Sequence, residues 1–256
     1  MRPNRVRQLL ASGQPVLNGW LLLPDSLSAE LMSHAGFDSL TVDMQHGMID
    51  FQSALSMLTA ISTTQTTPLV RVPWLDPGLV MKTLDAGAYG VICPMINSRQ
   101  QAQQFVAATR YAPTGNRSFG PLRAALYAGD DYALHANDTV LNLAMIETAQ
   151  ALDKIDDILS VEGLDAIYIG PADLSLSMKG KAVHDTMEGD IGDAIRHILA
   201  RAKAHNVFAG THTSSTQFAL KMLELGFRFV TCCNDTRLIA AGASNAVREM
   251  RGGLKQ

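Results

Sequence analysis

The amino-acid sequence predicts one (β/α)8 barrel, of the TIM-barrel class, that extends over residues 1–256 as a single α/β domain. Eight short apolar runs recur along the chain with helix-length amphipathic segments between them, which is the pattern of parallel α/β proteins. Several runs, among them LVRV and AIYIG, are apolar at nearly every position, as expected of strands buried on both faces. The length of 256 residues is typical of one such barrel.

The predicted strands and helices follow one another in regular order. The strands cover residues 19–23, 40–43, 69–72, 90–93, 143–147, 166–170, 207–210 and 229–232. Helix starts are predicted where a capping side chain precedes an amphipathic segment, at Asp25 with Ser26, at Asp50 and at Ser98. Helix ends are predicted at the glycines that follow such segments, Gly36, Gly87 and Gly226.

Two segments depart from this alternation. Residues 111–140 contain several prolines and glycines and are too long for an ordinary connection, so we predict a functional loop region after the fourth strand. The apolar stretch TRLIAAGASNAVREM follows the eighth strand and predicts a C-terminal helix. This helix either packs on its own barrel or docks on a neighbouring chain.

Composition and charge exclude several classes of protein. The 21 Lys and Arg residues against 24 Asp and Glu residues give a net charge of −3, without the basic patch of a nucleic-acid or acidic-membrane binder. Polar residues interrupt the N-terminal segment, so it lacks the continuous apolar stretch of a signal peptide. No apolar run reaches the roughly 18 residues that a membrane span needs. We therefore expect a cytoplasmic protein with no nucleic-acid or membrane partner. The three cysteines lack metal-type spacing and are expected to be reduced core thiols.

Polar side chains stand at the ends of four predicted strands. In barrels of this kind the chemistry lies at the carboxyl ends of the strands. The second strand ends in Asp43 and leads into His46, the third carries Arg71, the fifth ends in Glu147, and the sixth leads into Asp173. We expect these five side chains to converge on one mouth of the barrel.

Glu147 and Asp173 are candidate metal ligands. Neighbouring strands lie about 4.8 Å apart, so the two carboxylates can share one divalent cation. Ligands that are all oxygen favour magnesium, manganese or a similar ion. The alternative is that both acids are helix N-caps or first-turn residues, where a negative charge is also favourable.

Arg71 and His46 are candidate catalytic residues. Arg71 is a charge within an apolar strand, where its planar guanidinium suits a carboxylate or a developing oxyanion, and the alternative is a structural salt bridge. His46 can transfer protons near neutral pH, and Asp85, just before the fourth strand, is an acid that can orient it. His212 is a weaker candidate at the rim. We assign no chemistry to the remaining histidines, His34, His135, His184, His197 and His205.

Some expected motifs are missing from the sequence. There is neither a GxGxxG motif nor a Walker loop, which argues against dinucleotide or nucleoside triphosphate binding. The segments that follow the seventh and eighth strands lack the glycine of a barrel phosphate site, so a phosphorylated substrate is disfavoured. None of the seven lysines lies in a predicted strand, where a desolvated Schiff-base amine is expected.

The motifs TVDMQHG, LVRVPW, TLDAGAYGVICPM, RYAPTGNRSFGP, AMIET and IYIGPADLS resemble, in order and spacing, those of the HpcH/HpaI aldolases. These are metal-dependent class II pyruvate aldolases. The resemblance covers nearly the whole chain. It implies a barrel that assembles into homo-oligomers, typically hexamers with an exchanged C-terminal helix. It also implies cleavage of 4-hydroxy-2-oxo acids to pyruvate and an aldehyde, with magnesium, manganese or cobalt as cofactor.

The resemblance also implies a role for each matching residue. Glu147 and Asp173 would hold the metal, and Arg71 would contact the keto or enolate oxygen. His46 would handle protons through water, paired with Asp43 or Asp85 in the same subunit or across a subunit boundary. The substrate carboxylate would be received in the segment Gly170, Pro171, Ala172 and Asp173, by the backbone amides of its last two residues.

The chain departs from the family pattern at three places. Gln45 stands where the family usually has Glu, Met145 stands where Gln is common, and TCCND replaces a Val-Gly pair in the eighth strand. The aldehyde pocket is not readable from the sequence. Two other functions stay open: a lyase of acyl-coenzyme A esters on the same barrel, and a catalytically silent, oligomeric ligand-binding barrel.

Overall fold

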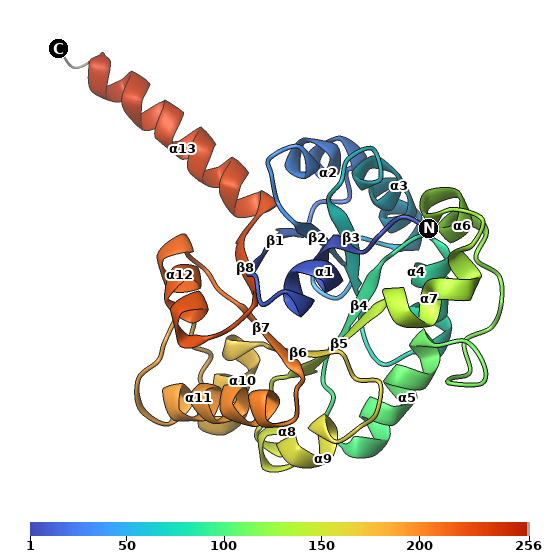
Figure 1. Ribbon diagram of the computed structural model, residues 1–256. Helices are drawn as coiled ribbons and strands as arrows, with labels where there is room; N and C mark the ends of the chain where they lie inside the picture. Colours follow the sequence, from blue (N-terminus) through green and yellow to red (C-terminus); the bar gives the residue numbers. More distant parts are fainter. Residues whose placement is uncertain (255–256) are drawn as a thin grey trace.

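The computed structural model describes residues 1–254, and these form a closed barrel of eight parallel strands in sequential order (Figure 1). The strands are β1 (Val16–Leu21), β2 (Ser39–Asp43), β3 (Thr67–Arg71), β4 (Gly90–Cys93), β5 (Leu141–Ile146), β6 (Ala166–Ile169), β7 (Phe208–His212) and β8 (Phe229–Asn234). Each predicted strand overlaps one of these, which confirms the predicted barrel. The largest difference is in β1, which begins at Val16 rather than at residue 19.

Helices surround the barrel and follow most of the strands (Figure 1). They are α1 (Arg5–Ala11), α2 (Ser26–Ser33), α3 (Phe51–Ile61), α4 (Pro77–Asp85), α5 (Arg99–Thr109), α6 (Leu122–Ala128), α7 (Tyr132–Thr139), α8 (Ala149–Asp153), α9 (Ile155–Leu159), α10 (Pro171–Lys179), α11 (Gly189–Ala204), α12 (Thr216–Leu225) and α13 (Asp235–Gly253). Asp25, Asp50 and Ser98 cap α2, α3 and α5 as predicted, because each side chain accepts a backbone N–H of the first turn. Over residues 1–254, none of the helices has the length and apolar character needed to cross a membrane.

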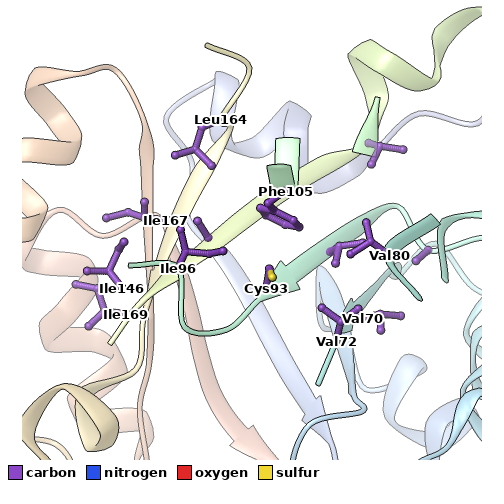
Figure 2. Close-up of a cluster of buried hydrophobic side chains, with 14 of the residues drawn as sticks. Val70, Val72, Val80, Cys93, Ile96, Phe105, Ile146, Leu164, Ile167 and Ile169 are labelled. Carbon is purple, nitrogen blue, oxygen red and sulfur yellow. The ribbon is translucent and has the colours of Figure 1, made fainter. Parts of the chain in front are cut away.

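Two apolar clusters lie on opposite sides of the strands. Successive strand residues point to opposite faces, so Leu69 packs inside the barrel while Val70 packs toward the helices. Figure 2 shows part of the outer cluster, which includes Ile167 and Ile169 of β6 together with Phe105 of α5. The strands are therefore covered on both faces, which explains their nearly continuous apolar runs.

The segment 111–140 is not one long loop, in contrast to our prediction. Its second half folds into α6 and α7, and it leads from α5 to the start of β5, at the amino-terminal end of the barrel. Hydrogen bonds tie this segment to the N-terminus: Asn4 Nδ2 donates to the carbonyl of Thr139 at 2.8 Å, and the Arg2 amide donates to the carbonyl of Ala128. The segment thus lies at the opposite end from the carboxyl ends of the strands.

Helix α13 extends away from the barrel (Figure 1). Asp235, its first residue, is its only buried residue, while Leu238, Ile239 and Val247 are exposed. The predicted C-terminal helix is therefore present. Its packing on its own barrel, which was one of the two alternatives, is not observed.

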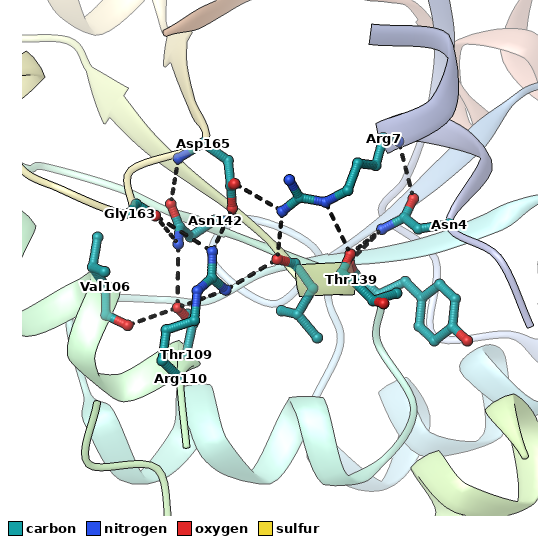
Figure 3. Close-up of polar contacts among 11 residues, drawn as sticks. Asn4, Arg7, Val106, Thr109, Arg110, Thr139, Asn142, Gly163 and Asp165 are labelled. Atoms are coloured by element: carbon teal, nitrogen blue, oxygen red, sulfur yellow. Dashed lines mark hydrogen bonds and ion pairs between the residues drawn. The ribbon is translucent and has the colours of Figure 1, made fainter. Parts of the chain in front are cut away.

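A polar network ties the amino-terminal end of the barrel together (Figure 3). Asp165 accepts hydrogen bonds from Arg110 Nη2 and from Arg7 Nη2, each at 2.7 Å. Its backbone N–H donates to Asn142 Oδ1 at 2.9 Å, and the Asn142 N–H returns a bond to the Asp165 carboxylate. Because Arg110 is only 4% exposed, its charge depends on this carboxylate.

We expect Asp165→Ala to lower the stability of the fold. The buried Arg110 would lose its ion-pair partner, and removing one partner of a buried pair costs roughly 3–5 kcal/mol. Since Asp165 is partly exposed, the expected loss is about 3 kcal/mol in the free energy of unfolding, measured by urea denaturation. Asp193→Ala is the matched control, because Asp193 pairs with Arg196 on the surface and should matter little. Equal midpoints for the two variants would contradict the prediction.

Candidate functional site

A cavity of about 160 Å³ opens at the carboxyl ends of the strands. Most of the side chains predicted to converge at this mouth do line it. The lining consists of His46, Arg71, Met145, Tyr168, Gly170, Pro171, Ala172, Asp173, His184, Asp185, His212 and Ser214. Asp43 and Glu147 are buried, and each contacts a residue of this lining.

Asp43 and Arg71 form a buried, two-pronged ion pair. The pairing of β2 with β3 sets these two residues side by side. Arg71 Nε donates to Asp43 Oδ1 at 2.8 Å, and Arg71 Nη2 donates to Oδ2 at 2.5 Å. Trp20 Nε1 also donates to Oδ2 at 3.0 Å, and the indole ring lies 4.8 Å from the guanidinium carbon. The remaining nitrogen, Arg71 Nη1, lies 3.9 Å from the sulfur of Met145, which also lines the cavity.

The ionisation of Asp43 is controlled by these neighbours. Burial by itself would raise the pKa of Asp43, but the hydrogen bonds and charge of Arg71, aided by Trp20, hold that pKa below its usual value. Asp43 therefore stays ionised at neutral pH and keeps Arg71 in place. The salt-bridge alternative for Arg71 is thus correct, and Arg71 also borders the cavity.

A tight turn after β2 places His46 at the rim of the cavity. Asp43 Oδ1 accepts the backbone N–H groups of Gln45 and His46, and the Gly47 N–H donates to the Asp43 carbonyl at 3.1 Å. A Cβ atom at Gly47 would lie 2.3 Å from that carbonyl oxygen, so the turn requires glycine. Asp43 contacts His46 through this backbone bond. Its observed role is to position Arg71 and the turn, which differs from the expected pairing with the imidazole.

Glu147 is a buried carboxylate directly after β5. The side chain accepts the Met95 N–H at Oε1, at 2.8 Å, and Met95 adopts a left-handed φ of 57° to supply it. Burial raises the pKa of Glu147 to about 7, and the negative charge of Asp173 acts in the same direction. A proton or a cation is therefore needed to compensate this carboxylate at neutral pH.

Asp173 lies in the first turn of α10, so the first-turn alternative is correct for it, and it also lines the cavity. Gly170, which precedes α10, lies against Glu147: a Cβ atom there would come 2.6 Å from Glu147 Oε2. Pro171 has no N–H, so Ala172 and Asp173 supply the first free amides of the helix. These amides border the cavity and can bind an anion there.

The chemistry of these donors fits a divalent cation. Glu147 Oε2 is not the oxygen that accepts the Met95 N–H, and the Asp173 charge is close enough to influence the Glu147 pKa. Within residues 1–254, no cluster of three or more His, Cys, Asp or Glu side chains could hold a metal. An ion held by two carboxylates and completed by substrate or water oxygens is typical of magnesium and manganese.

His212 lines the cavity as a neutral side chain. Its Nδ1 lies 3.2 Å from the hydroxyl of Tyr168, which also contacts Thr231 Oγ1 at 2.7 Å. Burial lowers the pKa of His212 to about 4, and the charge of Arg71 adds to this effect. His212 therefore lines the cavity, and its imidazole is uncharged over the neutral pH range.

Asp85 lies apart from the cavity in this chain. It is the last residue of α4, and its Oδ1 accepts Arg117 Nη2 at 2.7 Å. Burial raises the pKa of Asp85, while Arg117 opposes the shift. The Arg117 guanidinium also stacks on Tyr111, with 4.4 Å from its carbon to the ring centroid. Pairing of Asp85 with His46 across a subunit boundary stays a prediction.

Thiols and amines take no part in the cavity lining over the described chain. The three cysteines are free, as predicted: Cys93 is buried in the core, Cys232 is half-buried and packs against the core, and Cys233 is half-buried at the end of β8. The lysines up to Lys221 lie in helices or loops, as predicted. Lys255 lies outside the described residues.

Sequence reasoning missed four residues of the site. Tyr168 was hidden within an apolar strand, although strand alternation places it on the inner face with Trp20. His184 and Asp185 lie in an irregular segment between α10 and α11, and Ser214 lies after β7. No periodicity marks such loop residues, because their approach to the cavity depends on long-range contacts.

The barrel and its polar mouth are those of a (β/α)8-barrel enzyme. A family model described as HpcH/HpaI aldolase/citrate lyase matches residues 18–241. The chain therefore belongs to the HpcH/HpaI aldolase/citrate lyase family.

Similar proteins cover almost the whole chain. A hydroxypyruvate/pyruvate aldolase from Rhizorhabdus wittichii is 44% identical over 97% of this chain and 99% of its own. A 4-hydroxy-2-oxo-heptane-1,7-dioate aldolase from Salmonella dublin is 38% identical over 94% of this chain and 92% of its own. The crystal structure of a family protein from Burkholderia cenocepacia has a TM-score of 0.90 and 32% identity, covering 97% of this chain and 99% of that one.

We expect the affinity for Mn²⁺ to depend on pH through Glu147. Because its folded-state pKa is about 7, a cation must displace a proton below that pH. Calorimetric affinity should therefore rise about tenfold per pH unit up to pH 7 and then level off. The same raised pKa means that the contribution of Glu147 to stability without metal is full below pH 4.5 and is lost as the pH rises through 7.

Glu147→Gln is the control for this titration. The variant should bind Mn²⁺ weakly and without the pH-dependent step, since its amide carries no titrating proton. A wild-type affinity that is constant from pH 5.5 to 7 would contradict the prediction.

Proposed function

We propose that this protein is a divalent-metal-dependent pyruvate aldolase that cleaves 4-hydroxy-2-oxo acids to pyruvate and an aldehyde and catalyses the reverse addition. One observation carries the proposal: Asp173 and the fixed guanidinium of Arg71 line a single cavity, and the buried carboxylate of Glu147 lies directly against Gly170 of that lining. The aldolase names of both relatives support it, and they favour free 2-oxo acids over acyl-coenzyme A esters.

Different residues of the chain would bind the cation, the carboxylate and the C2 oxygen of the oxo acid. Glu147 and Asp173 would hold the cation, with magnesium, manganese or cobalt as candidates, and a bound cation supplies Lewis-acid polarisation of the oxo acid. The Ala172 and Asp173 amides bind the carboxylate of the oxo acid. Asp43 holds Arg71 so that Nη1 is left for the C2 oxygen.

Cleavage moves charge from the C4 hydroxyl to the C2 oxygen. His46, acting through water, removes the hydroxyl proton, the C3–C4 bond breaks, and the aldehyde leaves. The electron pair of that bond moves onto the C2 oxygen, where Arg71 stabilises the developing charge. A proton returned to C3 completes pyruvate. Arg71 does not need to reorganise during this step, because its ion pair with Asp43 is already formed.

The proposal predicts that activity needs a divalent cation and no imine. Metal-loaded protein, incubated with pyruvate and a panel of aldehydes, should form aldol adducts, and exhaustive chelation should abolish them until Mn²⁺, Co²⁺ or Mg²⁺ is restored. Borohydride in the presence of pyruvate should leave activity intact, because the described lysines lie outside the cavity. Full activity after chelation, or inactivation by borohydride, would refute the proposal.

Arg71→Lys tests the charge-stabilising role. Lysine keeps the charge but loses the two-pronged contact with Asp43, so kcat should fall roughly 100- to 1,000-fold, the loss seen when one oxyanion donor is removed. The melting temperature is measured on the same sample. A lower melting temperature with unchanged kcat per folded molecule would assign Arg71 a structural role alone.

We also propose that the active unit is a cytoplasmic homo-oligomer in which α13 packs on a neighbouring chain. The exposed apolar side chains of α13 support the association, and the unpaired cysteines agree with a reducing compartment. The hexamer rests on the family resemblance. Sedimentation velocity should show an oligomer that Ile239→Asp weakens, and a fully active wild-type monomer would contradict this.

A further inference from the structure

His184 reaches the cavity from a segment that has no regular structure. It lies between α10 and α11, in the stretch 180–188, and it is exposed at the rim. In this respect it differs from Arg71, Glu147 and Asp173, which are placed by strands or by the first turn of a helix. Loop residues of this kind are the usual determinants of specificity on a barrel scaffold.

Two anchors fix the backbone on either side of His184. On one side, the Val183 N–H donates to Ser175 Oγ at 2.8 Å, and the same buried hydroxyl donates to the Ala172 carbonyl at 2.9 Å. The His184 backbone is thereby tied to the first turn of α10, which lines the cavity.

On the other side, Asp185 accepts the Ser214 N–H at 2.7 Å and the Ser215 hydroxyl at 2.8 Å. Asp185 has a φ of 47°, in the left-handed region that few residues other than glycine adopt, so these bonds stabilise an otherwise unfavourable backbone. The segment is thus connected to the loop that follows β7. The backbone that carries His184 is thereby held at the rim of the cavity from both sides.

Under the proposed function, His184 lies in the part of the cavity that is left for the aldehyde, which is the acceptor in the addition reaction. Arg71 and the α10 amides are committed to the oxo acid. Of the remaining polar lining, Asp185 is bonded to the Ser214 N–H and the Ser215 hydroxyl, and the His212 imidazole contacts the Tyr168 hydroxyl. The His184 side chain is exposed at the rim of the same lining, and an imidazole can donate or accept a hydrogen bond. The volume of about 160 Å³ suits small molecules, since pockets for larger ligands measure roughly 300–1,000 Å³.

We propose that His184 is a specificity-determining residue that hydrogen-bonds the oxygen substituent next to the aldehyde carbon, so that the enzyme prefers short α-oxygenated aldehydes to alkyl aldehydes of similar size. This inference rests on the proposed function. A polar site of this kind discriminates because the analogue without the oxygen leaves the imidazole unpaired.

The test compares two aldehydes of similar size on the full-length, Mn²⁺-loaded protein. kcat/KM for addition of pyruvate is measured with glycolaldehyde and with propanal, for the wild type, His184→Phe and His184→Asn. His197→Phe is the matched control, because His197 is exposed on α11 outside the cavity lining. Exchange of the pyruvate methyl protons in D₂O, without aldehyde, reports on the donor half of the reaction alone.

His184→Phe should lower the glycolaldehyde-to-propanal ratio roughly 5- to 10-fold, the size of one lost hydrogen bond, with methyl-proton exchange unchanged. His184→Asn should restore part of the ratio, and His197→Phe should leave it unaltered. A ratio that stays within twofold of wild type in His184→Phe overturns the inference, as does a parallel loss of exchange. Wild-type protein that neither exchanges pyruvate protons nor forms an adduct overturns the proposed function itself.

Discussion

The buried ion pair between Asp43 and Arg71 is the interaction on which the site depends. An arginine within an apolar strand needs a negative partner, and the strand register supplies it from the adjacent position of β2. The same carboxylate accepts the backbone N–H groups that shape the turn carrying His46. One fully buried acid therefore sets the geometry of Arg71 and of the turn that carries His46 together.

At Glu147 the buried charge is negative, and no arginine of residues 1–254 is paired with it. Here the protein buries a carboxylate without a dedicated cation, gives it one backbone N–H from Met95, and places a second acid nearby. Such an arrangement is unfavourable unless a proton or a cation compensates the Glu147 carboxylate, and a metal ion would be a suitable partner. Gly170 keeps the required space, because any side chain there would collide with Glu147 Oε2.

The regular parts of this protein were accessible from the sequence because their causes are local. Strands buried on both faces read as apolar runs, and Asp25, Asp50 and Ser98 mark helix starts through bonds within one turn. Arg71, Glu147 and Asp173 could be predicted as site residues because they are polar residues at or just after the ends of apolar strands. Strand ends alone could not assign Asp43 to Arg71, since that pairing requires the register between β2 and β3. The position of His184 could not be predicted, because it depends on contacts between its segment and the loop after β7, about thirty residues away in the sequence.

The contacts that stabilise the barrel and the contacts that shape the cavity lie at opposite ends of the barrel. Asp165, Arg110 and Asn142 join strands and loops at the amino-terminal end, whereas the His184 segment makes its anchoring bonds at the other end, to Ser175 and Ser214. Under the proposed function, sequence changes in that segment would alter which aldehydes the cavity accepts without touching the contacts that close the barrel. Selection can therefore diversify the acceptor range of this scaffold at little risk to its folding, and laboratory evolution has the same freedom.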